Sequence, residues 1–156
     1  MNISFDLDGV IAESSRHFFR LLNALRTKSA WAKELELAEL DYYSNRPLLH
    51  HPNEFLASGD KGCIITSRKP RAKEETENWL RRHGITIPII FADADNILDW
   101  SDYPKASTRA GKLKAEVIRG IDIDVHFDNN PYIVKELRTL LPTVRIIQVG
   151  GEIANK

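Results

Sequence analysis

The chain has 156 residues but only one cysteine, and it carries no excess of charge of either sign. A lone Cys63 cannot form an internal disulfide, which excludes a disulfide framework and CxxC metal or redox motifs and indicates a reducing compartment. Lys and Arg number 22, and Asp and Glu also number 22. This balance argues against a protein that grips nucleic acid through bulk positive charge, although it leaves local basic patches open.

Long apolar runs are also missing. No stretch approaches the roughly 18 residues that a membrane-spanning helix needs, and the first residues enter a strand-like segment without a basic leader or a cleavage site. We therefore expect a cytoplasmic protein with no membrane partner. A hydrophobic share of 42% and a charged share of 28% are ordinary for a globular chain, and 156 residues predict a single domain.

Five short apolar segments have the length and the polar boundaries of β-strands, and helical patterns lie between most of them. The predicted strands are residues 2–5, 62–66, 87–91, 123–127 and 144–149. The predicted helices cover 73–83 and 108–119, and a third runs from a cap at Asn130 to a stop at Pro142. Strands that alternate with helices predict an α/β fold with a parallel sheet covered on both faces.

One stretch breaks this alternation. Residues 10–61 contain two helical patterns, 14–26 and 30–43, and no clear strand. We interpret approximately 13–56 as a small helical insertion after the first strand, within a single core domain that covers 1–156.

Polar side chains follow several of the predicted strands. Asp6 and Asp8 follow the first, Thr66 and Ser67 the second, and Asp128 the fourth. Ligands of parallel α/β sheets bind beyond the carboxyl ends of the strands, so we expect these side chains to share one site. Taken alone, the aspartate pair also fits a solvated turn, but the recurrence at corresponding strand ends favours a site.

Four segments resemble the four motifs of haloacid dehalogenase-like (HAD) superfamily phosphohydrolases. They are Phe5-Asp6-Leu7-Asp8-Gly9-Val10, Ile64-Ile65-Thr66-Ser67-Arg68, Gly111-Lys112-Leu113-Lys114-Ala115-Glu116 and His126-Phe127-Asp128-Asn129-Asn130. The resemblance covers most of the chain, and it implies a Rossmann-like core with strand order 5-4-1-2-3. In that order strand 1 lies between strands 2 and 4, which brings Asp6, Thr66 and Asp128 together.

The resemblance also implies roles for these residues. Asp6 is the expected nucleophile that forms an aspartyl-phosphate, and Asp8 is the expected general acid and base. The expected metal is Mg²⁺, bound by Asp6, the backbone carbonyl of Asp8, and Asp128. Thr66 and Ser67 are expected to hold phosphoryl oxygens.

Two points of the motif match need a decision. Either Lys114 or Lys112 can be the phosphate-binding lysine, and we favour Lys114 because the amphipathic pattern after it matches the family better. In the fourth motif, Asn129 stands where many members carry a second acid, which bears on the affinity for the metal. The presence of Asp8 argues against the dehalogenase branch, whose chemistry does not need a second acid.

The size of the insertion and the local charges bear on the substrate. A small cap suits a small phosphate ester, such as a nucleotide, or an open site for a nucleic-acid end, and the chain is similar to nucleotidase-like and polynucleotide phosphatase-like members. Basic residues gather after the second motif and before the fourth, which fits either an anionic substrate or a set of solvated helix starts: Arg68, Lys69, Arg71, Lys73, Lys105, Arg109, Lys112 and Lys114. The insertion's aromatic residues either stack a base or, as we favour, pack the cap.

Two alternatives to a phosphatase stay open at this stage. A non-catalytic HAD-fold protein that binds a phosphate ligand or a partner would explain Asn129, and a phosphomutase would need the same acids but a larger cap. We interpret the aspartates at 93, 95, 99 and 102 as an acidic surface loop, because Ile97 and Leu98 do not fit a calcium-binding loop.

Overall fold

The structure is a computed structural model, and it describes residues 1–15, 18 and 32–150. Five strands form one parallel sheet in the order β3-β2-β1-β4-β5, which is the predicted order read from the opposite edge. The strands are β1 (Asn2–Phe5), β2 (Lys61–Thr66), β3 (Ile89–Phe91), β4 (Val125–Asp128) and β5 (Arg145–Gln148). The predicted α/β fold class is confirmed.

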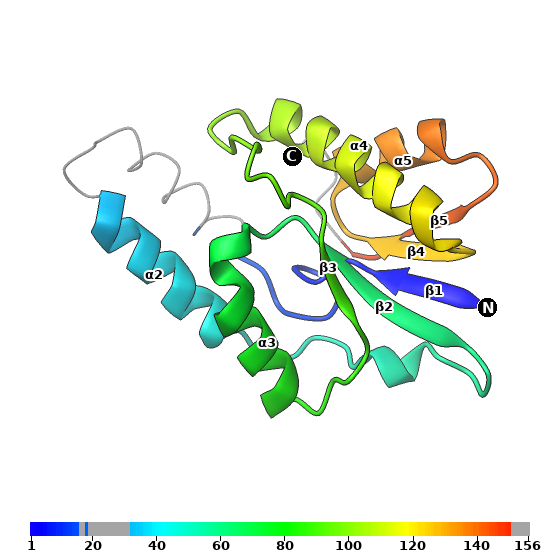
Figure 1. Cartoon of the computed structure of the whole chain (residues 1–156), viewed down its shortest axis with the longest axis horizontal. Helices are drawn as coiled ribbons and strands as arrows, with labels where there is room; N and C mark the ends of the chain where they lie inside the picture. The colour runs from blue at the N-terminus through cyan, green and yellow to red at the C-terminus, as the bar shows by residue number, and fades with distance from the viewer. Residues whose placement is uncertain (16–17, 19–31, 151–156) are drawn as a thin grey trace.

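Helices cover both faces of this sheet, so the architecture has three layers (Figure 1). The helices are α2 (Ala32–Ser44), α3 (Lys73–Arg82), α4 (Tyr103–Ile121) and α5 (Pro131–Leu140), with short 3₁₀ turns at Pro52–Glu54 and Pro70–Ala72. Neighbouring residues of a strand point to opposite faces. Ile65 therefore packs in the core beneath α4 and α5, whereas Ile64 packs with Trp79 of α3 on the other face.

Helix α4 begins earlier than the sequence predicts, at Tyr103 rather than Thr108. The Asp102 side chain accepts a hydrogen bond from the Lys105 backbone amide and so caps the helix. Asp93 is buried, and it accepts hydrogen bonds from the backbone amides of Ile97 and Leu98. The prediction of an acidic surface loop is therefore wrong for Asp93, which organises the loop from inside.

The segment between β1 and β2 is described in part. Helix α2 corresponds to the predicted helix 30–43, whereas nearly all of the predicted helix 14–26 lies outside the described residues. Tyr42 and Tyr43 of α2 are buried against Ala72, next to α3. These two aromatic side chains therefore pack α2 against the segment that leads into α3. No helix among the described residues has the length and apolarity to cross a membrane.

Candidate active site

The candidate site lies at the carboxyl edge of the sheet. Strand β1 ends directly before Asp6, β2 ends at Thr66 and β4 ends at Asp128. Because β1 pairs with β2 on one side and with β4 on the other, these three strand ends are neighbours. The Asp6 backbone amide extends the pairing by donating to the Phe127 carbonyl at 2.8 Å.

Lys114 of α4 joins two of the predicted acids. Its Nζ lies 2.8 Å from Asp6 Oδ1 and 2.6 Å from Asp128 Oδ2, and the residue is 1% exposed. A buried ammonium needs such partners because its desolvation is otherwise unfavourable. Lys112 is exposed, since two residues turn a helix by about 200°. The structure thus places Lys114 in the cluster and Lys112 outside it.

Two further contacts orient Asp128. His126 Nε2 lies 3.4 Å from Asp128 Oδ2, and His126 Nδ1 lies 2.8 Å from Ser4 Oγ. The Asn130 backbone amide donates to Asp128 Oδ1 at 2.9 Å. Sequence reasoning gave His126 no role, although the period of two in a strand, which puts His126 and Asp128 on one face of β4, was a usable signal.

Burial and the local charges set the protonation of this cluster. Burial raises the pKa of Asp6 to about 7, against the opposing effect of Lys114. Burial also disfavours the charge on Asp128, but Lys114 and His126 outweigh it and lower the pKa of Asp128 to about 2. Burial lowers the pKa of His126, against the opposing effect of Asp128, and so favours the neutral ring. An ionised Asp128 only accepts hydrogen bonds, so Nε2 of His126 donates to it and Nδ1 accepts from the Ser4 hydroxyl.

Asp8 has a different partner on the other side of β1. Arg68 follows β2 and is buried; its Nε donates to Asp8 Oδ2 at 2.8 Å and its Nη2 to Asp8 Oδ1 at 2.6 Å. This is a bidentate pair, which fixes the plane of a carboxylate. Sequence reasoning placed Arg68 among the basic residues around the site and missed this partner.

The hydroxyls of the second motif lie beside this pair. Thr66 is buried, and its Oγ1 accepts a hydrogen bond from the Arg68 backbone amide at 3.1 Å. The Ser67 Oγ is buried and has no hydrogen-bond partner among the described residues. A buried hydroxyl without a partner is costly unless a ligand satisfies it, so Ser67 suits a phosphoryl oxygen.

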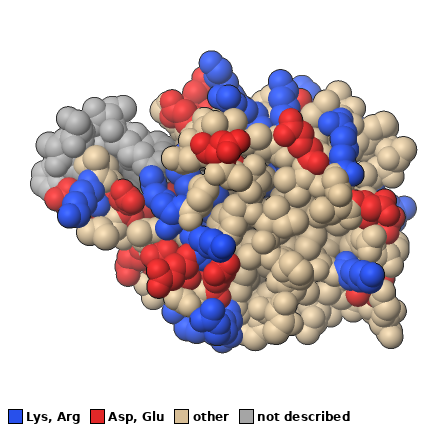
Figure 2. Space-filling view, viewed as in Figure 1, with Lys and Arg blue, Asp and Glu red and all other residues tan. Residues whose placement is uncertain are grey.

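The basic residues after the second motif are largely occupied within the fold. Lys69 Nζ donates to Asn96 Oδ1 at 2.9 Å and to the Leu98 carbonyl at 2.7 Å, and Arg71 forms an ion pair with Glu39. Together with Arg68 these cations tie loops and helices together rather than line an open anion site. Figure 2 shows acidic and basic side chains interspersed on the visible face.

Asn129, which directly follows β4, packs closely against Gly9 in the loop after β1. Gly9 has a φ of +89°, and a Cβ at this position would lie 2.0 Å from Asn129 Nδ2. Only glycine tolerates both the backbone conformation and the close approach. The amide of Asn129 therefore lies against the loop that carries Asp8.

The donors present fit an open magnesium site better than a closed metal cage. Among the described residues, no three His, Cys, Asp or Glu side chains are grouped to enclose a metal ion. Asp6 and Asp128 nevertheless supply two neighbouring carboxylates, which Lys114 joins. Mg²⁺ is usually held by one or two carboxylates, with water and substrate phosphate as the other ligands.

Comparisons with known proteins give matches at the level of structure only. No family model and no curated protein matches the chain. A chain in a structure of the Pnkp1/Rnl/Hen1 RNA repair complex matches over 97% of this chain, with a TM-score of 0.56 and 17% identity. A chain in a second structure of the Pnkp1/Rnl/Hen1 complex matches with a TM-score of 0.57 and 15% identity, also over 97%.

The sheet order, the strand ends that carry the motifs and these two matches decide the fold. The chain has a HAD-like fold. It spans 43% and 47% of the two matched chains, so less than half of each. The HAD domain of the effector protein Lem4 from Legionella pneumophila, described as an inactive mutant, also matches with a TM-score of 0.49 and 12% identity, over 98% of this chain and 87% of that one.

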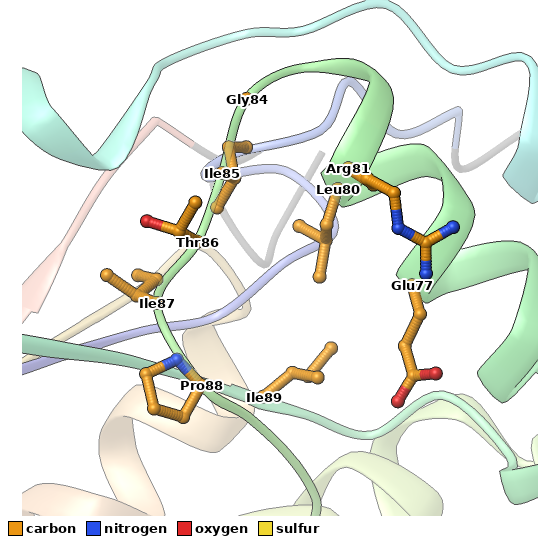
Figure 3. Close-up of a pocket in the computed structure, with 9 residues that line it drawn as sticks. All are labelled: Glu77, Leu80, Arg81, Gly84, Ile85, Thr86, Ile87, Pro88 and Ile89. Atoms are coloured by element: carbon orange, nitrogen blue, oxygen red, sulfur yellow. The ribbon is translucent and has the colours of Figure 1, made fainter.

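A separate pocket lies away from the carboxyl edge of this HAD-like sheet. Its cavity volume is about 600 Å³. Figure 3 shows its lining: Glu77, Leu80, Arg81, Gly84, Ile85, Thr86, Ile87, Pro88 and Ile89. Ile89 is the first residue of β3, so the pocket lies at the amino edge of the sheet. It therefore contributes no residue to the candidate active site.

Proposed function

We propose that the chain is a Mg²⁺-dependent phosphomonoester hydrolase that uses Asp6 as its nucleophile. The observation that carries the proposal is the buried Lys114, shared between Asp6 and Asp128 at the carboxyl edge of a HAD-like sheet. Buried ionisable groups with strongly shifted pKa values gather at functional sites, because a structural core has no need of their desolvated charges.

The proposed reaction has two displacements. Asp6 attacks phosphorus, so that a bond forms between its carboxylate oxygen and phosphorus while the bond to the leaving oxygen breaks. Asp8 gives its proton to the leaving oxygen, and it then takes a proton from the water that hydrolyses the aspartyl-phosphate. Thr66 and Ser67 hold phosphoryl oxygens, and Lys114 neutralises negative charge on the nucleophile and on the phosphoryl group.

Asp6, Asp128 and the backbone carbonyl of Asp8 would hold the Mg²⁺. When bound, the ion supplies positive charge that offsets the repulsion between an anionic nucleophile and an anionic phosphate. Lys114 takes the role of the phosphate-binding lysine in this proposal, and Lys112 takes none.

The proposed substrates are nucleotides and nucleic-acid ends. Residues 13–56 act as a small cap, and a cap of this size leaves room for either substrate. The shared fold with a chain of an RNA repair complex supports the choice, although that complex's activity is its own. A cytoplasmic location would give the chain access to both.

The test is phosphate release from an aryl phosphate, a panel of nucleotides and oligonucleotides with terminal phosphates. We expect turnover with Mg²⁺ and none with a chelator, and we expect Asp6→Asn to lose at least about three orders of magnitude in rate. Full activity of Asp6→Asn, or turnover that needs no metal, would contradict the mechanism. Transfer of phosphate to the substrate, detected by phosphorus NMR, would instead indicate a mutase.

A further inference from the structure

We propose that helix α2 positions the acid/base carboxylate of Asp8, through Tyr43 and Arg68. In this view the insertion is a working part of the site as well as a cover. The inference rests on the proposed function, since Asp8 acts as acid and base only if the chain hydrolyses phosphate esters.

The contact between Arg68 and Asp8 orients the carboxylate without blocking it. Each Asp8 oxygen accepts one guanidinium N–H, at 2.8 Å and 2.6 Å. A carboxylate oxygen has two lone pairs, so each retains one for a leaving oxygen or a water. The Asp8 side chain is 21% exposed, whereas that of Arg68 is 1% exposed. Arg68 thus holds both oxygens of the Asp8 carboxylate from the buried side, while part of the Asp8 side chain stays exposed to solvent.

Arg68 is itself held by two helices. Its Nη1 donates to Thr76 Oγ1 of α3 at 3.0 Å, and its guanidinium carbon lies 3.9 Å from the centroid of the Tyr43 ring of α2. A guanidinium stacks well on an aromatic face, and burial strengthens the attraction because water no longer competes. The stack of Tyr43 on Arg68 therefore connects α2 to the ion pair between Arg68 and Asp8.

Tyr43 is anchored in turn. Its hydroxyl donates to Glu39 Oε1 at 3.1 Å, and Arg71 Nη2 donates to Glu39 Oε2 at 2.6 Å. Tyr43 and Glu39 are both buried. Burial raises the pKa of Tyr43, which keeps its hydroxyl protonated as a donor. The Tyr43 ring is therefore held at its hydroxyl by Glu39, while its face stacks on Arg68.

The neighbouring Tyr42 provides a matched comparison. It is also buried on α2, and its ring centroid lies 3.9 Å from the guanidinium carbon of Arg46. Within the part of the chain that the structure describes, no hydrogen bond or ion pair joins Arg46 to Asp6, Asp8 or Asp128. The Tyr42 and Tyr43 rings also contact each other edge-on, with centroids 6.0 Å apart. The same substitution at the two positions therefore disturbs two similar stacks, of which only the Tyr43 stack includes the arginine that binds Asp8.

The leaving group separates a positioning role from a merely structural one. When a nucleoside monophosphate reacts, the electron pair of the broken bond goes to an alkoxide oxygen, which needs the proton of Asp8. When dinitrophenyl phosphate reacts, the phenolate is stable enough to leave without a proton. Misplacing Asp8 therefore slows the first substrate more than the second.

The experiment measures kcat/KM of the full chain with Mg²⁺ for both substrates. We expect Tyr43→Leu to lower the value about tenfold for the nucleoside monophosphate and less than about twofold for dinitrophenyl phosphate. Tyr43→Phe, which keeps the ring over Arg68, is expected to rescue the selective loss. Tyr42→Leu is expected to change both substrates by the same factor. Arg68→Lys, which cannot form the bidentate pair, is expected to give the selective loss in a larger form.

Each outcome decides a different claim. An equal loss on both substrates for Tyr43→Leu, or a selective loss for Tyr42→Leu, would overturn the role of α2 and leave the phosphatase in place. Wild-type protein that turns over neither substrate would overturn the proposed function and the inference together. If Tyr43→Leu fails to give a cooperative thermal transition, the pattern of Arg68→Lys decides, and an equal loss on both substrates contradicts the inference.

Discussion

Asp6 and Asp8 lie two residues apart just after β1, and their partners come from opposite sides of this strand. On the β4 side, Lys114 binds Asp6 and Asp128 in a cluster that is buried throughout. On the β2 side, Arg68 forms a bidentate ion pair with the partly exposed Asp8. A lysine supplies a compact charge and an arginine supplies a fixed geometry. The β4 side is thus built to balance charge, and the β2 side to orient one carboxylate.

This difference matches the proposed roles. A nucleophile and a phosphate-binding site need the repulsion between negative groups reduced, which one buried ammonium between two carboxylates achieves. A general acid needs its proton at a defined point, which a bidentate partner achieves. The two sides should therefore respond differently when their cations or supporting residues are changed.

The largest expected loss of stability follows from removing the cation on the β4 side. Lys114→Met leaves two carboxylates buried without their cation, and we expect the free energy of unfolding to fall by about 3–5 kcal/mol. Lys112→Met, the same change at an exposed position of α4, is expected to shift it by no more than about 0.5 kcal/mol. Urea denaturation followed by circular dichroism measures both, and similar losses in the two variants would contradict the placement of Lys114.

A smaller loss of stability is expected at His126, which contacts Asp128. His126→Leu removes the donor to Asp128 and leaves the Ser4 hydroxyl buried without its partner, so we expect a loss of about 1–3 kcal/mol in the free energy of unfolding. Ser4→Ala removes only the outer member of the chain and is expected to cost less. Chemical denaturation of the two variants measures both losses in the free energy of unfolding. A larger loss for Ser4→Ala than for His126→Leu would contradict the prediction.

The protonation of Asp6 gives a prediction on pH. Its pKa rises from the ordinary 3.8 to about 7 in the fold. Between these values the folded chain binds more protons than the unfolded chain, so the contribution of Asp6 to stability falls as pH rises toward 7. In the presence of a chelator, Asp6→Asn is expected to be more stable than wild type by about 1–3 kcal/mol at pH 8, and by less at pH 5. Thermal melts at both pH values measure the difference; an advantage that grows at pH 5 has the wrong sign.

The smallest expected effect lies between the two sides. Asn129→Asp adds a third carboxylate beside the loop of Asp8, and more ligand charge strengthens the binding of a hard cation. We expect the Mg²⁺ concentration for half-maximal phosphate release to fall by a factor of about 2–5. A magnesium titration of the steady-state rate checks this, with Asn53→Asp on the exposed 3₁₀ turn as the control that should change nothing. A higher magnesium requirement in Asn129→Asp would place its side chain outside the metal site.

Much of the fold followed from local patterns. The strands have apolar runs of the right length, and their polar ends meet at one edge because parallel strands share a direction. For the same reason, Asp6, Thr66 and Asp128 could be placed at one edge of the sheet, and the strand order implied by the resemblance to HAD phosphohydrolases made them neighbours there. The start of α4 was missed because its capping residue, Asp102, stands in a run of aspartates that also fits a loop.

The partners of long side chains could not be read from the sequence. Arg68 reaches Asp8 across 60 positions, and Tyr43 reaches Arg68 from α2, a helix whose packing no local pattern specifies. A basic residue near a phosphate motif looks the same in sequence whether it binds a ligand or a neighbouring carboxylate. The buried role of Asp93 was missed for a related reason, since burial depends on how the loop folds back over it.

The most direct test of the central claim is chemical trapping of the aspartyl-phosphate. The chain is mixed with substrate and Mg²⁺, quenched in acid and treated with borohydride, which reduces an acyl phosphate to an alcohol. Peptide mass spectrometry should then find homoserine at position 6 in wild type with substrate, and aspartate at this position without substrate. Phosphate release with no homoserine at Asp6, or with homoserine at Asp8 or Asp128 instead, would contradict the account.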